Sequence, residues 1–318
     1  MTTQLERDLD RLACLAGRSK RVTDLPGGLT NRNLRVQTDD GGDYVVRCSH
    51  PGAQLLGIDR DAEHHNTLRA AEAGVGADVV EYRPDLRMLV IEFLPGDVLT
   101  DASFADPVVL RRAARSVRTL HGGPRFQGEF DMFARQASYL ATVKSQGFRL
   151  PASYDDHAGR WADVRRALQS APRPTVPCNN DLLAANFIDG FIDGSIDGFI
   201  DGSIDGGDHV WLIDYEYSGN NDPCFELGNT AAECGFTPEQ TEAWTEAYFG
   251  TPSVADLARV RLQSVCSAYG WSLWGFIQAC TSTLDFDFYA WGEERLDRAA
   301  AVLRGPELGA LLEEVSRG

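Results

Sequence analysis

The sequence predicts an α+β fold of two lobes, a small β-rich N-terminal lobe over residues 1–95 and a larger, mainly helical lobe over 96–318. Strand–turn–strand patterns over 25–48 and 79–94 predict the first lobe. After Pro95-Gly96, apolar residues recur mostly at helical spacing, which predicts the second. The length of 318 residues allows two modest lobes, because one domain takes about 150 residues.

In the N-terminal lobe, a leucine stripe of helical spacing predicts a first helix that ends at Gly17. A strand over 25–38, an Asp-Asp-Gly-Gly turn and a strand over 44–48 form the first predicted hairpin. A helix over 59–73 and a second hairpin over 79–94 complete the lobe.

In the C-terminal lobe, apolar periodicity predicts helices over 107–121 and 129–147. The apolar and aromatic run 209–217 predicts a strand. The remainder, 238–318, is predicted to be helical, with breaks at Gly250, Pro252 and Gly305-Pro306.

Residues 188–206 consist of five Ile-Asp-Gly units on a four-residue period. Such low complexity favours an exposed loop at a hairpin tip. A calcium-binding Asp/Gly repeat is the sharper alternative, although its period differs from the nine-residue calcium repeats. A third alternative is that the isoleucines extend a hairpin.

The net charge of the chain limits the classes of partner that we expect it to bind. Thirty Lys and Arg against 47 Asp and Glu give a net charge of −17. Such a surface repels nucleic acid and anionic lipid, so we expect neither as a partner, whereas a cationic substrate fits. No run approaches the roughly 18 apolar residues of a membrane span. A homodimer is compatible with the sequence.

The seven cysteines are dispersed, and none forms a CxxC pair. An odd, scattered count predicts reduced thiols in a cytoplasmic protein, not a disulfide framework or a zinc site. The charged N-terminal segment lacks the apolar core of a signal peptide. We therefore expect a cytoplasmic location.

Two features of the first lobe could contact phosphates. The glycine pair at Gly27-Gly28 allows backbone N–H groups to approach an anion closely, although the segment does not match the P-loop pattern. Arg47 ends an apolar strand, and Glu63 on the next helix could hold its guanidinium in place. The alternatives are a plain hairpin turn and a surface salt bridge.

Two features of the second lobe could support phosphoryl transfer. Asp181 and Asn186 have the D-x-x-x-x-N spacing in which Asp takes a hydroxyl proton and Asn binds Mg²⁺. Asp214 ends an apolar strand, which suits a carboxylate ligand of Mg²⁺. The alternative for the Asp181–Asn186 pair is the capping of local turns.

The order of these features along the chain is typical of a protein-kinase-like fold. From about residue 25 to 300, the chain resembles the choline/ethanolamine kinase family, within the aminoglycoside-phosphotransferase-like superfamily. The stretches that carry the resemblance are GGLTN (27–31), IEFLPG (91–96), NNDLLAANF (179–187) and LIDYEYSGNNDPCFELGN (212–229).

The resemblance implies an ATP-dependent, Mg²⁺-dependent kinase that phosphorylates the hydroxyl of a cationic amino alcohol, choline or ethanolamine. Asp181 would be the catalytic base, and Asn186 and Asp214 would hold the metal. The implied nucleotide-binding residues are Gly27, Gly28, Leu29, Thr30, Asn31, Arg47, Glu63, Glu92 and Leu94, with adenine at the hinge near Glu92–Leu94.

The acceptor site is implied by aromatic residues near the C-terminus. Trp271 and Trp274 are three residues apart and share one helix face. Aromatic faces bind quaternary ammonium groups by cation–π attraction. The resemblance adds Glu216, Tyr217 and Glu233 to this site. The alternative is that both tryptophans are core residues of an amphipathic helix.

Two positions depart from the family pattern. Asn179 stands where the family usually has His at the opening of the catalytic loop, and Glu226 stands where it usually has Asp. We expect retained but reduced activity. The alternatives are a kinase for an aminoglycoside, thiamine or another small molecule, a nucleotide-binding pseudokinase, and a structural protein without a nucleotide site.

Overall fold

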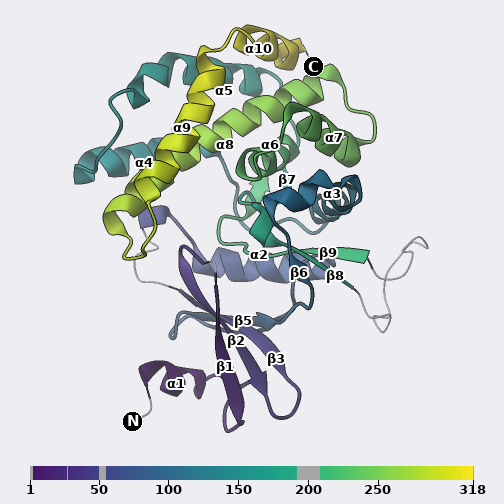
Figure 1. The fold of residues 1–318 in the computed structure, drawn as a ribbon, viewed down its shortest axis with the longest axis vertical. Helices are drawn as coiled ribbons and strands as arrows, with labels where there is room; N and C mark the ends of the chain where they lie inside the picture. The colour runs from purple at the N-terminus through teal and green to yellow at the C-terminus, as the bar shows by residue number, and fades with distance from the viewer. Residues whose placement is uncertain (1–2, 27, 50–54, 192–207, 318) are drawn as a thin grey trace.

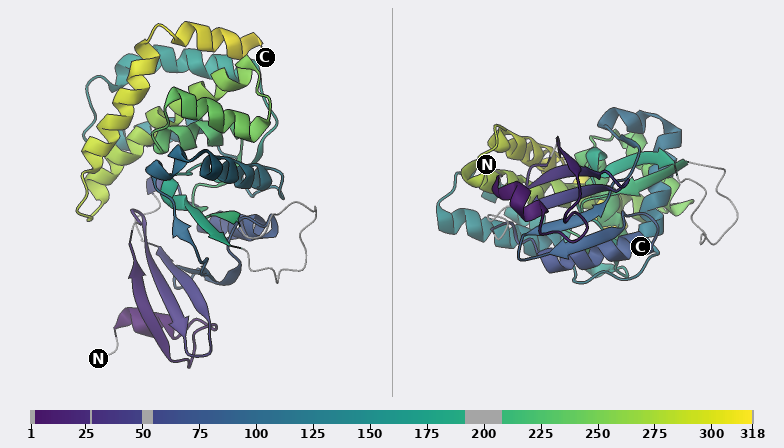
Figure 2. Two further views of the ribbon diagram at one scale, coloured as in Figure 1. Left: turned by 45° about the vertical axis from the view of Figure 1, so that its right-hand side comes forward. Right: turned by 90° about the horizontal axis from the view of Figure 1, so that it is seen from below.

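The protein is described by a computed structural model, which covers residues 3–26, 28–49, 55–191 and 208–317 (Figure 1). A five-stranded sheet lies at the N-terminal end of the molecule, and most of the helices gather at the other end (Figures 1 and 2). This arrangement confirms the predicted α+β class. The last strand of the sheet along the chain ends at Glu92, and the lobe boundary near residue 95 stays a prediction.

The five-stranded sheet is antiparallel, with strand order β1-β2-β3-β5-β4. Its strands are β1 (Lys20–Leu25), β2 (Asn31–Thr38), β3 (Asp43–Ser49), β4 (Val79–Arg83) and β5 (Met88–Glu92). The predicted strand over 25–38 is wrong in its first part, because β1 ends at Leu25 and β2 begins at Asn31. Strand β1 is absent from the predicted elements, because this edge strand is polar and mostly exposed.

The first helix is shorter than predicted. Helix α1 spans Gln4–Leu9 and begins with a capping box between Thr3 and Glu6. Leu12 and Leu15 lie beyond the helix, in turns, yet both are fully buried against the sheet. The leucine stripe therefore predicts the buried face correctly and the helix length wrongly.

Helix α2 (Arg60–Glu72) matches the predicted helix over 59–73. Asp59 is its N-cap and accepts hydrogen bonds from the backbone of Asp61 and Ala62. The helix lies between the five-stranded sheet and the helical part (Figure 1). It buries polar side chains, including Glu63 and Asn66, against a polar site, and near its C-terminal end Ala70 joins an apolar core cluster.

Two small sheets lie between the five-stranded sheet and the helical part. One contains β6 (Asp97–Val98), β8 (Phe187–Phe191) and β9 (Asp208–Leu212), in the order β6-β8-β9. The other pairs β7 (Val176–Cys178) with β10 (Gly219–Asn221). The predicted strand over 209–217 is too long, because Asp214 has a φ of 66° and leaves the strand conformation. Most of the Ile-Asp-Gly repeat, residues 192–206, lies outside the described residues.

The helical part is built around α8 (Val254–Thr281). Its other α-helices are α3 (Pro107–His121), α4 (Met132–Gln146), α5 (Ala158–Ser170), α6 (Pro223–Glu233), α7 (Pro238–Phe249), α9 (Phe288–Arg304) and α10 (Leu308–Arg317). Helix α8 packs against α4, α6, α9 and α10. Gly228 allows α6 to approach closely, since a Cβ atom there would lie 2.6 Å from the carbonyl oxygen of Val260. Within the described part of the chain, no helix has the length and apolar character to cross a membrane.

Candidate active site

The β8–β9 hairpin brings Asn186 and Asp214 together. Phe187 pairs with Leu212 in the hairpin register, and the next backbone contact joins the Ile213 N–H to the Asn186 carbonyl oxygen at 3.0 Å. Asn186 donates from Nδ2 to the Asp181 carbonyl oxygen at 2.9 Å, which leaves its Oδ1 as a ligand atom. The amide oxygen and the Asp214 carboxylate are the oxygen donors that Mg²⁺ prefers, so these residues fit the ion.

Asn179 holds the loop of Asp181 against the segment of Asp214. Its Nδ2 donates to the carbonyl oxygens of Ile213 at 3.1 Å and Asp214 at 2.8 Å. Its Oδ1 accepts the backbone N–H of Asp181 at 3.1 Å. A side-chain amide therefore connects both segments, with donors and an acceptor used together.

Asn180 and Glu226 fix the backbone of the same loop. Asn180 has a φ of 68°, a conformation that Asn tolerates, and its Nδ2 donates to three backbone carbonyls. Glu226, on α6, accepts the backbone N–H of Asn179 at 2.7 Å and that of Asn180 at 2.6 Å. The glutamate side chain at this position thus supplies both acceptors that the loop needs.

Asp181 has the electrostatics of a proton acceptor. Burial raises the pKa of its carboxyl well above the usual range, and the nearby carboxylates of Glu233, Asp214 and Glu216 raise it further. Arg295 opposes this effect. A carboxylate with a raised pKa takes a proton from an alcohol more readily than an ordinary Asp does.

Arg47 lies at the centre of a buried ion-pair network. Its guanidinium lies 3.1 Å from Glu63, 2.5 Å from Asp214 and 3.1 Å from Glu216. Burial alone would lower the pKa of Arg47, but these carboxylates raise it above the usual value. Burial raises the pKa of Asp214 to about 6, against the lowering effect of Arg47. The predicted Arg47–Glu63 pair is present and is buried, not a surface salt bridge.

Glu216 connects this network to the glycine-rich loop. It accepts hydrogen bonds from Thr30 Oγ1 at 2.7 Å and Asn31 Nδ2 at 2.8 Å. Arg60 lies 3.1 Å from Glu216 and 2.6 Å from Glu63. Glu216 is predicted to bind the acceptor, whereas its contacts are with the predicted nucleotide-binding residues. Arg60, three residues before Glu63 on the same helix face, is absent from the predicted site.

The glycine-rich loop joins β1 to β2. At Gly28, a Cβ atom would lie 2.3 Å from the Asn31 carbonyl oxygen, so a side chain cannot fit. Leu29 packs against the core cluster of the helical part. Gly27 lies outside the described residues.

A small cavity lies between the sheet and the β8–β9 hairpin, and Arg47 is the predicted nucleotide-binding residue among its described lining residues. Its apolar walls include Ala77, Leu89, Ile91 and Ile213, and Arg47 and Asp214 form its charged side. At the predicted hinge, Glu92 is exposed and Leu94 is half-buried. Apolar walls with a charged end suit a base that carries phosphates.

The predicted acceptor aromatics do lie together. The rings of Tyr217 and Trp271 are 4.8 Å apart, and Trp274 donates from Nε1 to the Tyr217 hydroxyl at 3.0 Å. Trp271 is 3% exposed and donates from Nε1 to Asn229 Oδ1 at 3.0 Å. Trp291 on α9, 5.1 Å from Trp274, is an aromatic neighbour that the sequence analysis missed. Its Tyr-Ala-Trp context on a separate helix gave no spacing signal.

Glu233 forms an ion pair with Arg295, with Nε of Arg295 at 3.1 Å. The guanidinium of Arg295 also lies 3.3 Å from the centre of the Trp291 ring. Glu233 therefore has a protein counter-ion, which the sequence analysis did not foresee. It remains close enough to Asp181 to raise that residue's pKa.

Comparison with known proteins gives consistent results. The profile of the phosphotransferase enzyme family, APH, matches residues 21–201. Human ethanolamine kinase 1 is 25% identical over 313 residues, covering 85% of this chain and 65% of that protein. Mouse choline/ethanolamine kinase is 22% identical over 321 residues, covering 86% of this chain and 78% of that protein. This chain thus spans just under two thirds of the human protein's length.

Solved structures agree with the fold. A choline/ethanolamine kinase family protein from Mesorhizobium loti is 31% identical, with a TM-score of 0.82 and full coverage of both chains. Choline kinase LicA from Streptococcus pneumoniae is 22% identical, with a TM-score of 0.76, covering 94% of this chain and 99% of that chain. A LicA structure in complex with AMP has a TM-score of 0.73 at 21% identity, covering 97% and 99%. These matches confirm the predicted kinase-like fold.

Proposed function

The chain belongs to the phosphotransferase enzyme family APH, among relatives of choline/ethanolamine kinases, and we propose that it transfers the γ-phosphoryl group of ATP to the hydroxyl of choline or ethanolamine. The observation that carries this proposal is the meeting of Asp181, Asn186 and Asp214 beside the buried Arg47. A proton acceptor, two oxygen ligands for a metal and a cation are the parts that phosphoryl transfer requires.

The base of ATP would enter the small cavity between the sheet and the β8–β9 hairpin. Adenine would contact the apolar walls near Leu89 and Ile91, next to the hinge at Glu92–Leu94. The backbone of residues 27–31 would cover the phosphates, with Glu216 fixing Thr30 and Asn31. Arg47 would contact the phosphates, because its position is held by Glu63. The LicA complex with AMP supports a nucleotide in this fold.

Asn186 and Asp214 would hold Mg²⁺, which, when bound, neutralises charge on the transferring phosphates. Asp181 would orient the acceptor hydroxyl and accept its proton as the oxygen attacks the γ-phosphorus. Asn179 and Glu226 hold the Asp181 loop in place through backbone hydrogen bonds. Most of the rate enhancement would come from positioning and electrostatic stabilisation.

The cationic head of the acceptor would contact the aromatic cluster of Tyr217, Trp274 and Trp291, with Trp271 packed behind Tyr217. Aromatic faces attract ammonium groups, and the net charge of −17 attracts a cation from a distance. Glu233 lies near this cluster, where its charge is paired with that of Arg295.

Turnover of ATP with Mg²⁺ tests the proposal against a panel of choline, ethanolamine, thiamine and an aminoglycoside. We expect turnover with choline or ethanolamine. Turnover with only thiamine or the aminoglycoside would support phosphoryl transfer from ATP, but to a different acceptor from the one proposed. ATP binding without any turnover would favour the pseudokinase alternative.

Seven free cysteines support a reducing, cytoplasmic compartment for this reaction.

A further inference from the structure

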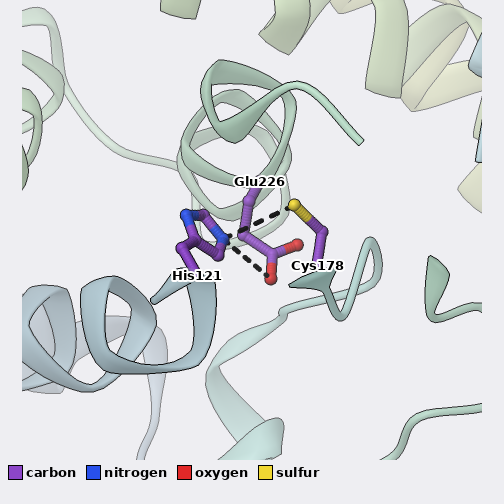
Figure 3. A group of neighbouring side chains, drawn as sticks. All are labelled: His121, Cys178 and Glu226. Carbon is purple, nitrogen blue, oxygen red and sulfur yellow. Dashed lines mark hydrogen bonds and ion pairs between the residues drawn. The ribbon is translucent and has the colours of Figure 1, made fainter. Parts of the chain in front are cut away.

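Behind the loop of Asp181, three buried side chains converge that the proposed reaction does not use as ligands or proton carriers. They are His121 at the end of α3, Cys178 at the end of β7 and Glu226 on α6 (Figure 3). Their relative exposures are 7%, 0% and 0%. Each offers one atom that can bind a metal, and these atoms all lie within 4.8 Å of one another.

The two separations from His121 Nε2 are close to those of a tetrahedral site, and Cys178 Sγ lies within 4.8 Å of a Glu226 carboxylate oxygen. His121 Nε2 lies 3.5 Å from Cys178 Sγ and 3.7 Å from Glu226 Oε1. Zinc bonds of about 2.0–2.3 Å place tetrahedral ligand atoms about 3.3–3.6 Å apart. Figure 3 shows the imidazole facing both the thiol and the carboxylate.

The other ring nitrogen of His121 is held by a second partner. His121 Nδ1 lies 2.7 Å from the Tyr248 hydroxyl, on α7. When Nδ1 donates its proton to that oxygen, Nε2 keeps a lone pair directed at Cys178 and Glu226. Metal-binding histidines almost always have such a partner on the second nitrogen.

We propose that His121, Cys178 and Glu226 form a binding site for a thiophilic divalent cation of the Zn²⁺ class, distinct from the Mg²⁺ position at Asn186 and Asp214. On binding, the cation forms bonds to Nε2, Sγ and Oε1, and the thiol proton of Cys178 leaves to water. Mg²⁺ does not compete, because it prefers oxygen ligands and avoids thiolates. The dispersed cysteines without a CxxC pair predict no zinc site, and the three ligands of this one lie far apart in the chain.

The site lies directly behind the catalytic loop. Glu226 Oε1, the proposed ligand atom, also accepts the Asn179 backbone N–H at 2.7 Å. Asn179 in turn holds Asp181 and the segment of Asp214. The metal would therefore share one carboxylate oxygen with the backbone that positions the catalytic base.

The test uses the full chain with Co²⁺ as a spectroscopic probe and Zn²⁺ as a competitor, in the presence of excess Mg²⁺. We expect one Co²⁺ per chain, with a sulfur-to-cobalt charge-transfer band and intense tetrahedral visible bands, both removed by Zn²⁺. Cys178→Ala should abolish the charge-transfer band. Cys266→Ala is the matched control, since Cys266 is also fully buried but lies in the core cluster of the helical part, to which Cys178 does not belong, and it should keep the band.

Tyr248→Phe is a second variant that changes no ligand. It removes the partner of His121 Nδ1 and should weaken Co²⁺ and Zn²⁺ binding about 10- to 100-fold. Zn²⁺ should also raise the Tm of the wild type and of Cys266→Ala, but not that of Cys178→Ala, because only the site of the folded chain binds it. A charge-transfer band that survives in Cys178→Ala, or no band and no Tm shift in the wild type, would overturn the proposal.

Discussion

Thr30 donates a hydrogen bond from Oγ1 to Glu216 Oε1 at 2.7 Å, although 186 residues separate the two along the chain. The bond connects the glycine-rich loop to the segment that follows Asp214. Glu216 also contacts Arg47 and Arg60. Burial alone would raise the pKa of Glu216, but these two guanidinium groups and the hydrogen bonds from Thr30 and Asn31 lower it. Glu216 is therefore charged and connects the glycine-rich loop to Arg47, which lines the proposed nucleotide cavity.

Glu216→Gln tests this link. It removes the charge between Arg47 and Arg60, and hydrogen bonds to charged groups contribute about 1.5–3 kcal/mol. We expect the KM for ATP to rise about tenfold or more, with a smaller change in the KM for the acceptor. Steady-state kinetics with each substrate varied in turn measures the split. Glu72→Gln, in the exposed Arg69–Glu72 pair of the same helix as Arg60, is the control and should change neither. A rise confined to the acceptor KM would return Glu216 to the acceptor site.

We expect Asp181→Asn to lower kcat and to raise the Tm. Loss of a general base costs about 10²- to 10⁴-fold in kcat. The raised pKa of Asp181 means that its charged form destabilises the fold at neutral pH, so the variant should have a higher Tm in the absence of nucleotide and Mg²⁺. Ordinary turnover in the variant would remove Asp181 from the mechanism. An unchanged or lower Tm would contradict the assignment of an electrostatic cost to this carboxylate.

Trp274→Ala should weaken acceptor binding. A desolvated cation–π contact contributes about 2 kcal/mol, so we expect the acceptor KM to rise about tenfold or more while the KM for ATP changes little. Trp244→Ala is the matched control, because Trp244 is a fully buried tryptophan of a different core cluster. Both variants should lower the Tm. Equal changes in both KM values for Trp274→Ala would mean that this tryptophan only packs.

We expect Asn179→Ala to lower kcat because the loop of Asp181 is no longer held in place, and not because a reacting group is removed. The substitution leaves the carbonyls of Ile213 and Asp214 and the N–H of Asp181 without their partner. Such a loss costs about 1–3 kcal/mol for a buried polar group. We expect lower kcat and lower Tm, and Asn179→His should restore part of both. If Asn179→Ala turned over like the wild type, the amide would have no role in holding the loop.

The sequence predicts local secondary structure better than it predicts which residues from distant segments come into contact. The helix over 59–73, the hairpin over 79–94 and the helix over 107–121 are confirmed because caps, turns and periodicity are local properties. Strand β1 was missed because its polar, exposed residues lack the alternation that marks a half-buried strand. The leucine stripe of α1 continues through turns, since burial does not require a helix.

In the candidate site, too, local patterns are predicted from the sequence and long-range contacts are not. The spacing of Asp181 and Asn186 and the position of Asp214 were readable, and the hairpin register explains why they meet. The roles of Glu216, Arg60 and Trp291 were not readable, because each depends on which distant segment lies opposite. Neither spacing nor composition could place Arg295 against Glu233, or His121 beside Cys178.

Turnover of ATP with Mg²⁺ against choline, ethanolamine, thiamine and an aminoglycoside, compared between the wild type and Asp181→Asn, tests the central claim most directly. We predict phosphorylation of choline or ethanolamine by the wild type and its near-complete loss in the variant, with ATP binding retained in both. Binding of ATP with no phosphorylation of any acceptor, or equal phosphorylation by both proteins, would contradict the account.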